Sequence, residues 1–302
     1  MPSSSRSELS TLRDLIRYGV SRLREAGVAL GHGSDNAWDE TVYLVLHALH
    51  LPLDTLDPFL DARVLPDERE RVLDLIDRRA TERLPAAYLT QEAWLCGHRF
   101  YVDPRVIVPR SPIAELLEQS LSPWVEPESV QAALDMCTGS GCLAILTALA
   151  FPDAQVDAVD VSSEALQVAR RNVADYGLQD RLALHQSDLF DQLPAREYDV
   201  VVCNPPYVNS ASMAALPDEY RHEPGLALAG GADGMDLVRR ILAAAPRYLS
   251  AQGVLILEIG HERAHFEAAF PHLHPVWLDT EAASDQILLL TREQLAQDTT
   301  AP

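Results

Sequence analysis

The sequence predicts an α/β protein in which a small helical domain precedes a mostly parallel sheet. Two observations lead to this fold class. Apolar runs of strand length alternate with helical patterns from residue 131 onward, the order that builds a parallel sheet. Before residue 90, apolar residues recur at helical spacing instead. With 302 residues, the chain is long enough for one or two domains with a sizeable core.

The helical domain is expected over residues 1–90 and is predicted to help recognise the substrate, because its apolar faces exceed what a linker needs. Its three predicted helices cover residues 8–27, 34–50 and 66–82. One face of the first carries a continuous apolar stripe, formed by Leu9, Leu12, Ile16, Val20 and Leu23. Pro66 marks the start of the third helix, because proline is favoured at the first helical position.

Residues 91–110 are predicted to form a β-hairpin linker, because apolar and polar residues alternate on both sides of a turn at Asp103-Pro104. Ser111-Pro112 then opens a helix that runs to about Leu121.

The second domain is expected over residues 111–302. Its predicted strands cover residues 132–136, 154–160, 181–188, 198–203, 253–260, 273–279 and 285–291. Its predicted helices cover 142–151, 162–176, 235–249 and 261–270, with Ser162 as an N-cap. A long loop follows over residues 204–234; loops of that length in a compact domain are usually functional or disordered. The tail is expected to fray from about residue 294.

The charge balance indicates which partners suit the chain. The net charge is −21, and all 24 basic residues are arginine. Residues 91–302 hold 13 arginines against 30 acidic residues, a balance of −17. Such a field repels phosphate backbones and attracts basic partners, so we expect a basic protein partner and no direct nucleic-acid contact.

The remaining bulk features favour the cytoplasm. The first ten residues are polar, and no apolar run reaches the length of a membrane span. The four cysteines form no C-x-x-C pair and are expected to be reduced thiols. We therefore expect no membrane association.

The segment "LDMCTGSGC", residues 134–142, carries the first chemical signal. It reads as a strand, a glycine turn and a helix start, in which Gly139 and Gly141 allow a tight turn and close approach to a ligand. Acidic residues stand at three successive strand ends: Asp135, Asp160 and Asp188. An acid after the second strand can accept hydrogen bonds from ribose hydroxyls. A carboxylate after the third could accept from an adenine amino group.

The segment "CNPPYV", residues 203–208, carries the second signal. Pro205 and Pro206 cannot donate ladder hydrogen bonds, so the apolar strand before them must end there. Proline also holds the preceding residue extended, which makes the loop stiff. It presents the Asn204 amide, backbone carbonyls and the Tyr207 ring at the carboxyl edge of the sheet, where open α/β sheets bind ligands.

Together, the residue 135–141 turn, Asp160, Asp188 and Asn204-Pro205-Pro206-Tyr207 resemble the S-adenosylmethionine-dependent methyltransferases that modify planar nitrogens. The helical domain, the hairpin and the "EP…AL…GADG" pattern of residues 223–234 resemble the family that methylates glutamine side-chain amides in proteins, over about residues 8–292. "LDMCTGSGC" and "VPRSPI" resemble the branch acting on a large-subunit ribosomal protein of the uL3 type. The release-factor branch usually has a second threonine at Ser140 and an acidic, threonine-containing motif at Ser111-Pro112-Ile113.

The resemblance implies a Rossmann-like class I methyltransferase sheet, mostly parallel with its last strand antiparallel, and S-adenosyl-L-methionine as cofactor. The residues implied to bind the cofactor are Asp135, Cys137, Thr138, Gly139, Ser140, Gly141, Asp160, Asp188, Leu189 and Asn204. Those implied to contact the substrate glutamine are Asn204, Pro205, Pro206 and Tyr207, and of these Asn204, Pro205 and Tyr207 are implied to be catalytic. Phe100, on the hairpin, is a further candidate to cover cofactor or substrate.

Amide chemistry suggests what these residues do. A carboxamide nitrogen is a poor nucleophile because its lone pair is delocalised. The Asn204 side-chain oxygen and the Pro205 carbonyl can accept its two N–H groups, favour positive charge on the nitrogen and aim it at the methyl group. No strong base need act before transfer, because the attacking amide is neutral.

Other functions stay open at this point. Release-factor glutamine methylation uses the same chemistry. Nucleic-acid amino-methylation also uses an Asn-Pro-Pro-aromatic loop, but a basic groove should accompany it. A dehydrogenase would leave the proline loop unexplained, and an assembly factor with a decayed cofactor site would not need the glycines intact. "HERAH", residues 261–265, matches a zinc-protease motif but lacks a clear third ligand, so we expect no metal.

Overall fold

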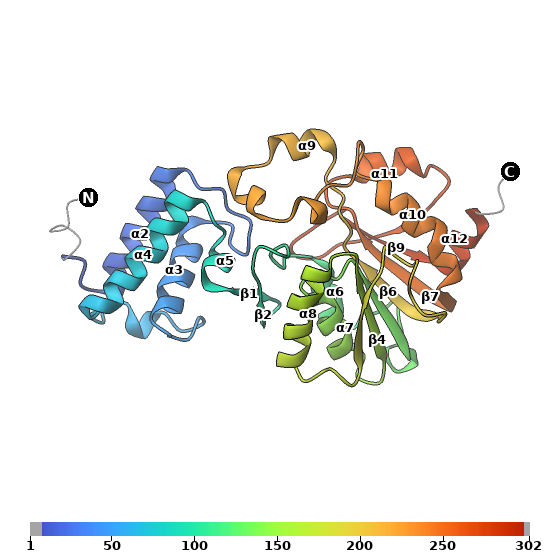
Figure 1. Ribbon diagram of the computed structural model, residues 1–302, viewed down its shortest axis with the longest axis horizontal. Helices are drawn as coiled ribbons and strands as arrows, with labels where there is room; N and C mark the ends of the chain where they lie inside the picture. The colour runs from blue at the N-terminus through green and yellow to red at the C-terminus, as the bar shows by residue number, and fades with distance from the viewer. Residues whose placement is uncertain (1–7, 299–302) are drawn as a thin grey trace. The chain divides into compact units, whose positions relative to one another are not determined.

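The computed structural model describes residues 8–298 and divides them into two compact units (Figure 1). The helical unit comprises residues up to 93 together with 217–222. The sheet unit comprises residues 94–216 and those from 223 onward. The sequence did not indicate that six residues of the long loop belong to the helical unit.

Three predicted helices build the helical unit: α2 (Leu12–Ala26), α3 (Ala37–Ala48) and α4 (Pro66–Glu82). Thr11 caps α2 in a capping box with Asp14, and Asn36 caps α3. The helices pack against one another through their apolar faces. A Cβ atom at Gly19 would lie 2.4 Å from Cγ2 of Thr41, so glycine permits the close crossing of α2 and α3. The short helix α5 (Ala86–Thr90) follows.

A buried group of charges ties residues 217–222 into this unit. The Arg79 side chain is fully buried; its Nε donates to Glu40 at 2.7 Å and its Nη1 to Glu219 at 3.5 Å. Glu219, only 1% exposed, also accepts from the Ala29 amide and from Arg83, each at 2.9 Å. Buried charges are stable only when paired in this way.

The sheet unit contains seven strands in the order β5-β4-β3-β6-β7-β9-β8. Their bounds are β3 Ala132–Met136, β4 Gln155–Asp160, β5 Leu182–Gln186, β6 Tyr198–Cys203, β7 Leu249–Glu258, β8 Val276–Leu278 and β9 Ile287–Thr291. The first five run parallel, whereas β9 is antiparallel to β7 and to β8. The mostly parallel sheet with its last strand antiparallel is thus confirmed.

Helices cover both faces of the sheet (Figure 1). The helices α6 (Ile113–Glu118), α7 (Cys142–Ala150) and α8 (Ser163–Asp175) lie on one face. The helices α10 (Asp236–Ala244), α11 (Arg263–Ala269) and α12 (Arg292–Asp298) lie on the other. Successive residues of β6 and β7 pack alternately into the two apolar clusters, because side chains alternate along a strand. This explains their continuous apolar sequences.

Three local predictions were wrong. The hairpin of β1 (Glu92–Leu95) and β2 (His98–Tyr101) turns at Cys96-Gly97, both with positive φ, and not at Asp103-Pro104. The helix predicted to reach Leu121 ends at Glu118, because Ser120 and Leu121 adopt positive φ. The tail forms α12 instead of fraying from 294, and its Leu295 is buried. Residues 299–302 lie outside the described range.

The loop over residues 204–234 is less irregular than predicted. It holds α9 (Ser210–Ala215) and two 3-10 turns, Asp218–His222 and Gly225–Ala227. The helix predicted over 235–249 is shorter than expected, because Pro246 follows it and a 3-10 turn takes over. In the described part of the chain, no helix is both long enough and apolar enough to span a bilayer.

Candidate cofactor and substrate site

The site lies where the strand order reverses. From β3 the chain moves outward to β4 and β5, then returns to place β6 on the other side of β3. The carboxyl ends of β3 and β6 therefore flank a crevice, with Cys137 after one strand and Asn204 after the other. Open α/β sheets bind ligands at such a point.

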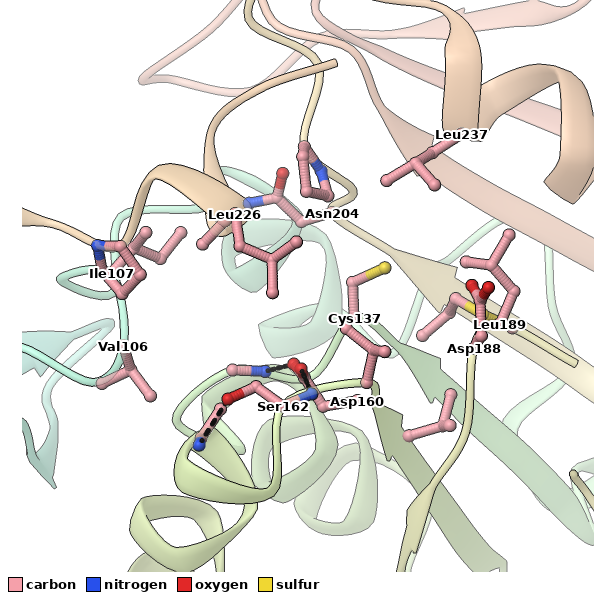
Figure 2. Close-up of a pocket in the computed structure, with 18 of the residues that line it drawn as sticks. Val106, Ile107, Cys137, Asp160, Ser162, Asp188, Leu189, Asn204, Leu226 and Leu237 are labelled. Atoms are coloured by element: carbon pink, nitrogen blue, oxygen red, sulfur yellow. Dashed lines mark hydrogen bonds between the residues drawn. The ribbon is translucent and has the colours of Figure 1, made fainter. Parts of the chain in front are cut away.

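A cavity of about 310 Å³ occupies this crevice. That volume is within the range of small-molecule sites, which are mostly apolar with a few placed polar groups. Figure 2 shows Asp160 and Asn204 on opposite sides of it. The lining residues that the sequence had indicated are Cys137, Gly139, Asp160, Asp188, Leu189, Asn204 and Pro206.

The glycine turn and Asp160 hold each other in place. The two carboxylate oxygens of Asp160 accept from the amides of Gly139 and Ser162, each at 2.9 Å (Figure 2). Cys137, Gly139 and Gly141 all have positive φ. A Cβ at Gly141 would lie 3.1 Å from that of Ala169, so glycine lets the turn pack closely on α8. Burial raises the pKa of Asp160, against the lowering effect of its amide donors.

Asp188 and Leu189 follow β5 at the edge of the cavity (Figure 2). The Asp188 carboxylate is about half exposed and pairs with Arg240 of α10 at 2.9 Å. Arg240 also lines the cavity, so this side combines a carboxylate with a guanidinium.

The Asn204 amide is available to a ligand. Among residues 8–298, neither its side chain nor the Pro205 carbonyl makes a hydrogen bond. Both residues after Asn204 are buried prolines, and Val208 pairs with Ala229 just beyond them. Two free acceptors therefore stand on a rigid loop at the end of β6.

Several predicted site residues do not line the cavity. Asp135 is buried in β3 and accepts from the Thr138 hydroxyl at 2.5 Å; burial raises its pKa to about 7. Ser140 is buried too, and its carbonyl accepts from Asn172 at 2.8 Å. Asp135, Ser140 and Gly141 therefore maintain the conformation of the turn without lining the cavity. Pro205 and Tyr207 belong to the Asn204 loop but are also absent from the lining.

Phe100 requires a correction. Its side chain has no exposed surface and stacks on Tyr176 within the apolar cluster of α6, α7 and α8. A ring without exposed surface cannot cover a cofactor or substrate in this cavity. At this position the hairpin contributes to the core. The alternation of apolar and polar residues in the sequence could not show whether Phe100 points into the core or toward the site.

Other lining residues were missed by the sequence analysis. Val106, Ile107, Leu226 and Leu237 give the cavity much of its apolar surface (Figure 2). Leu226 is 64% exposed. These residues come from a loop, a 3-10 turn and a helix far apart in sequence, so no local signal would have found them.

The cavity fits S-adenosylmethionine. An apolar slot can hold an adenine ring, and Asp160 retains unused lone pairs for ribose hydroxyls, because an ionised carboxylate offers about four acceptor sites. The backbone of Gly139 borders the cavity with no atom within 4 Å of the position a Cβ would take. This leaves room for a cofactor to approach the turn closely.

The "HERAH" segment makes hydrogen bonds within the sheet unit. Glu262 accepts from Asn209 Nδ2 at 2.6 Å and also contacts His265. In the part of the chain that the structure describes, no three His, Cys, Asp or Glu side chains are grouped to hold a metal ion.

Comparison with known proteins identifies the family. Residues 114–216 match the model of the methyltransferase small domain. The chain is 80% identical to a ribosomal protein uL3 glutamine methyltransferase of Bordetella pertussis, over 98% of this chain and 99% of that protein. It is 61% identical to the protein of that name from Burkholderia pseudomallei, over 97% and 98% of the two chains. It is 56% identical to the protein of that name from Neisseria gonorrhoeae, over 98% of this chain and 99% of that protein. The chain therefore belongs to the ribosomal protein uL3 glutamine methyltransferases, a family of S-adenosylmethionine-dependent enzymes.

Proposed function

We propose that this protein methylates the side-chain amide nitrogen of one glutamine in ribosomal protein uL3, using S-adenosylmethionine. The observation that carries the proposal is that Asn204 faces Asp160 across the cavity, with its amide oxygen and the adjoining Pro205 carbonyl both free to accept hydrogen bonds. The relatives' names give the substrate class.

When bound, the cofactor supplies an electrophilic methyl group. The chain's own residues position the nucleophile. Asn204 and Pro205 each accept one N–H of the glutamine amide, which orients the nitrogen and stabilises the positive charge that develops on it. The prolines keep both acceptors fixed, so little reorganisation is needed. The proton leaves the nitrogen after transfer.

The cofactor would be held by three groups of residues. Asp160 receives the ribose hydroxyls, and Asp188 and Leu189 border the base. Cys137 and Gly139 face the cofactor directly, whereas Asp135, Thr138, Ser140 and Gly141 maintain the turn.

The charge of the chain suits a basic partner. The balance of −17 over residues 91–302 attracts a basic protein and disfavours direct contact with phosphate backbones. A ribosomal protein substrate also fits a cytoplasmic location.

The helical unit would help to select that partner. The apolar faces of its helices exceed what a linker needs, but α2, α3 and α4 bury those faces against one another, so they are not what a partner would contact. A different observation supports the role: every residue that lines the cavity belongs to the sheet unit. The helical unit is therefore not needed to build the cavity, which leaves it free for partner recognition.

Labelling with radioactive cofactor tests the proposal. Purified uL3 and a release factor are incubated with wild-type protein and with Asn204→Ala. We expect labelling of uL3 on one glutamine, located by mass spectrometry. The variant should lose roughly a hundredfold in turnover, as on removal of one oxyanion-hole donor, with cofactor affinity nearly unchanged. Preferential labelling of the release factor would refute the partner, and wild-type turnover by the variant would refute the role of Asn204.

A further inference from the structure

A buried carboxylate that the proposed chemistry does not use lies beside the Asn204 loop. Glu258 is the last residue of β7 and is 3% exposed. Because Leu257 pairs in parallel with Cys203, Glu258 is level with Asn204 at the carboxyl edge of the sheet. The sequence analysis had not singled it out.

Two hydroxyl groups donate to this carboxylate from different segments. Tyr207 donates to Oε1 at 2.9 Å, and Ser111, which precedes α6, donates to Oε2. Burial raises the pKa of Glu258, while the two hydroxyl donors and the Arg110 guanidinium lower it. The carboxylate thus links the end of β7 to the tyrosine of the Asn204 loop.

Glycines allow the protein to enclose Tyr207. A Cβ at Gly260 would lie 2.4 Å from Cε2 of the Tyr207 ring, and one at Gly234 would lie 2.2 Å from its carbonyl oxygen. A Cβ at Gly230 would lie 2.7 Å from the Tyr207 Cα. The ring and its backbone are therefore packed on several sides, and the hydroxyl direction is set by Glu258.

We propose that Glu258 is a positioning residue for methyl transfer: by accepting from the Tyr207 hydroxyl it fixes the ring, and through it the loop that presents Asn204 and Pro205 to the glutamine amide. Glu258 does not touch the reacting atoms. The inference rests on the proposed function, since it concerns the same transfer step.

A second buried carboxylate in the same unit offers a matched control. Asp157 of β4 is 4% exposed and accepts from the Tyr198 hydroxyl at 3.0 Å, and neither residue belongs to the Asn204 loop. Glu258→Leu and Tyr207→Phe remove the hydrogen bond at the site, because leucine offers no acceptor, and Asp157→Ala and Tyr198→Phe remove its counterpart elsewhere.

The test compares kcat for uL3 labelling, cofactor Kd by calorimetry and thermal stability across these variants. Glu258→Leu and Tyr207→Phe should each lower kcat about tenfold, because the loop then holds Asn204 and Pro205 less accurately against the glutamine amide, with Kd within about twofold. The kcat of the double variant should be no lower than that of the less active single variant. The control variants should lose stability but keep kcat within about twofold.

Three results would overturn the proposal: wild-type kcat in Glu258→Leu, multiplicative losses in the double variant, or a loss of cofactor affinity as large as the loss of kcat. If Glu258→Leu does not fold, the comparison of Tyr207→Phe with Tyr198→Phe decides, and wild-type kcat in Tyr207→Phe overturns the proposal. Failure of the wild-type protein to label uL3 would instead contradict the proposed function.

Discussion

Replacing Gly260 by alanine should lower the rate of methyl transfer, because the added methyl group displaces the Tyr207 ring. Gly260 follows β7 with φ +54, and the added Cβ would lie 2.4 Å from Cε2 and 2.8 Å from Cζ of Tyr207. Nonbonded carbons approach to about 3.5–4.0 Å, so the ring must shift by about 1 Å. A shift of that size would disrupt the 2.9 Å hydrogen bond to Glu258. Misplacement of about 1 Å can cost roughly a hundredfold in rate.

Gly177 provides the control for backbone strain. It follows α8 with φ +66, and no atom lies within 4 Å of the position a Cβ would take. Alanine in the left-handed region costs about 1–2 kcal/mol at either position. Both variants should therefore unfold at lower urea concentration, whereas only Gly260→Ala should lose kcat, by about 10- to 100-fold. Equal kcat in the two variants would refute the argument from Tyr207 packing.

Three other predictions concern the cofactor, the helical unit and pH. Asp160→Ala should weaken S-adenosylmethionine binding by about 1–3 kcal/mol in calorimetry, the cost of a lost hydrogen bond to a charged group, and unchanged affinity would exclude the assigned role. Glu219→Ala leaves Arg79 buried without one partner and should lower the free energy of unfolding by about 3 kcal/mol. Asp61→Ala, which breaks an exposed ion pair with Arg13, should have little effect, and similar urea curves for the two would contradict this reasoning. Asp135 has its pKa raised by burial to about 7, so the native state favours the protonated carboxyl, and its stabilising contribution is lost as pH rises from about 4 through 7. The melting temperature of Asp135→Asn relative to wild type should therefore increase over that interval, and a constant difference would show that Asp135 does not titrate there.

Local sequence signals determined the sheet and part of the site. The apolar run of residues 198–203 ends at two prolines, and the turn at Gly139 and Gly141 requires positive φ. Both depend on the backbone chemistry of a few neighbouring residues, which holds in any surroundings. The strand ends at Asp160 and Asn204 were predictable for the same reason, and so was their meeting at one edge, because parallel strands share their carboxyl side.

Tertiary packing determined the features that local sequence patterns did not predict. Phe100 follows the alternation expected of a site residue, yet the sheet unit buries it in the core, where its ring stacks on Tyr176. The turn at Cys96-Gly97 prevailed over Asp103-Pro104, and Asp103 instead accepts from Tyr101 and Arg105. Residues 217–222 join the helical unit because the Glu219 carboxylate finds its partners in Arg79 and Arg83, more than 100 positions earlier in the chain. Glu258 contacts Ser111 and Tyr207 only once the sheet has formed. A buried carboxylate needs hydrogen-bond partners nearby in space, and these partners are far from it in the sequence.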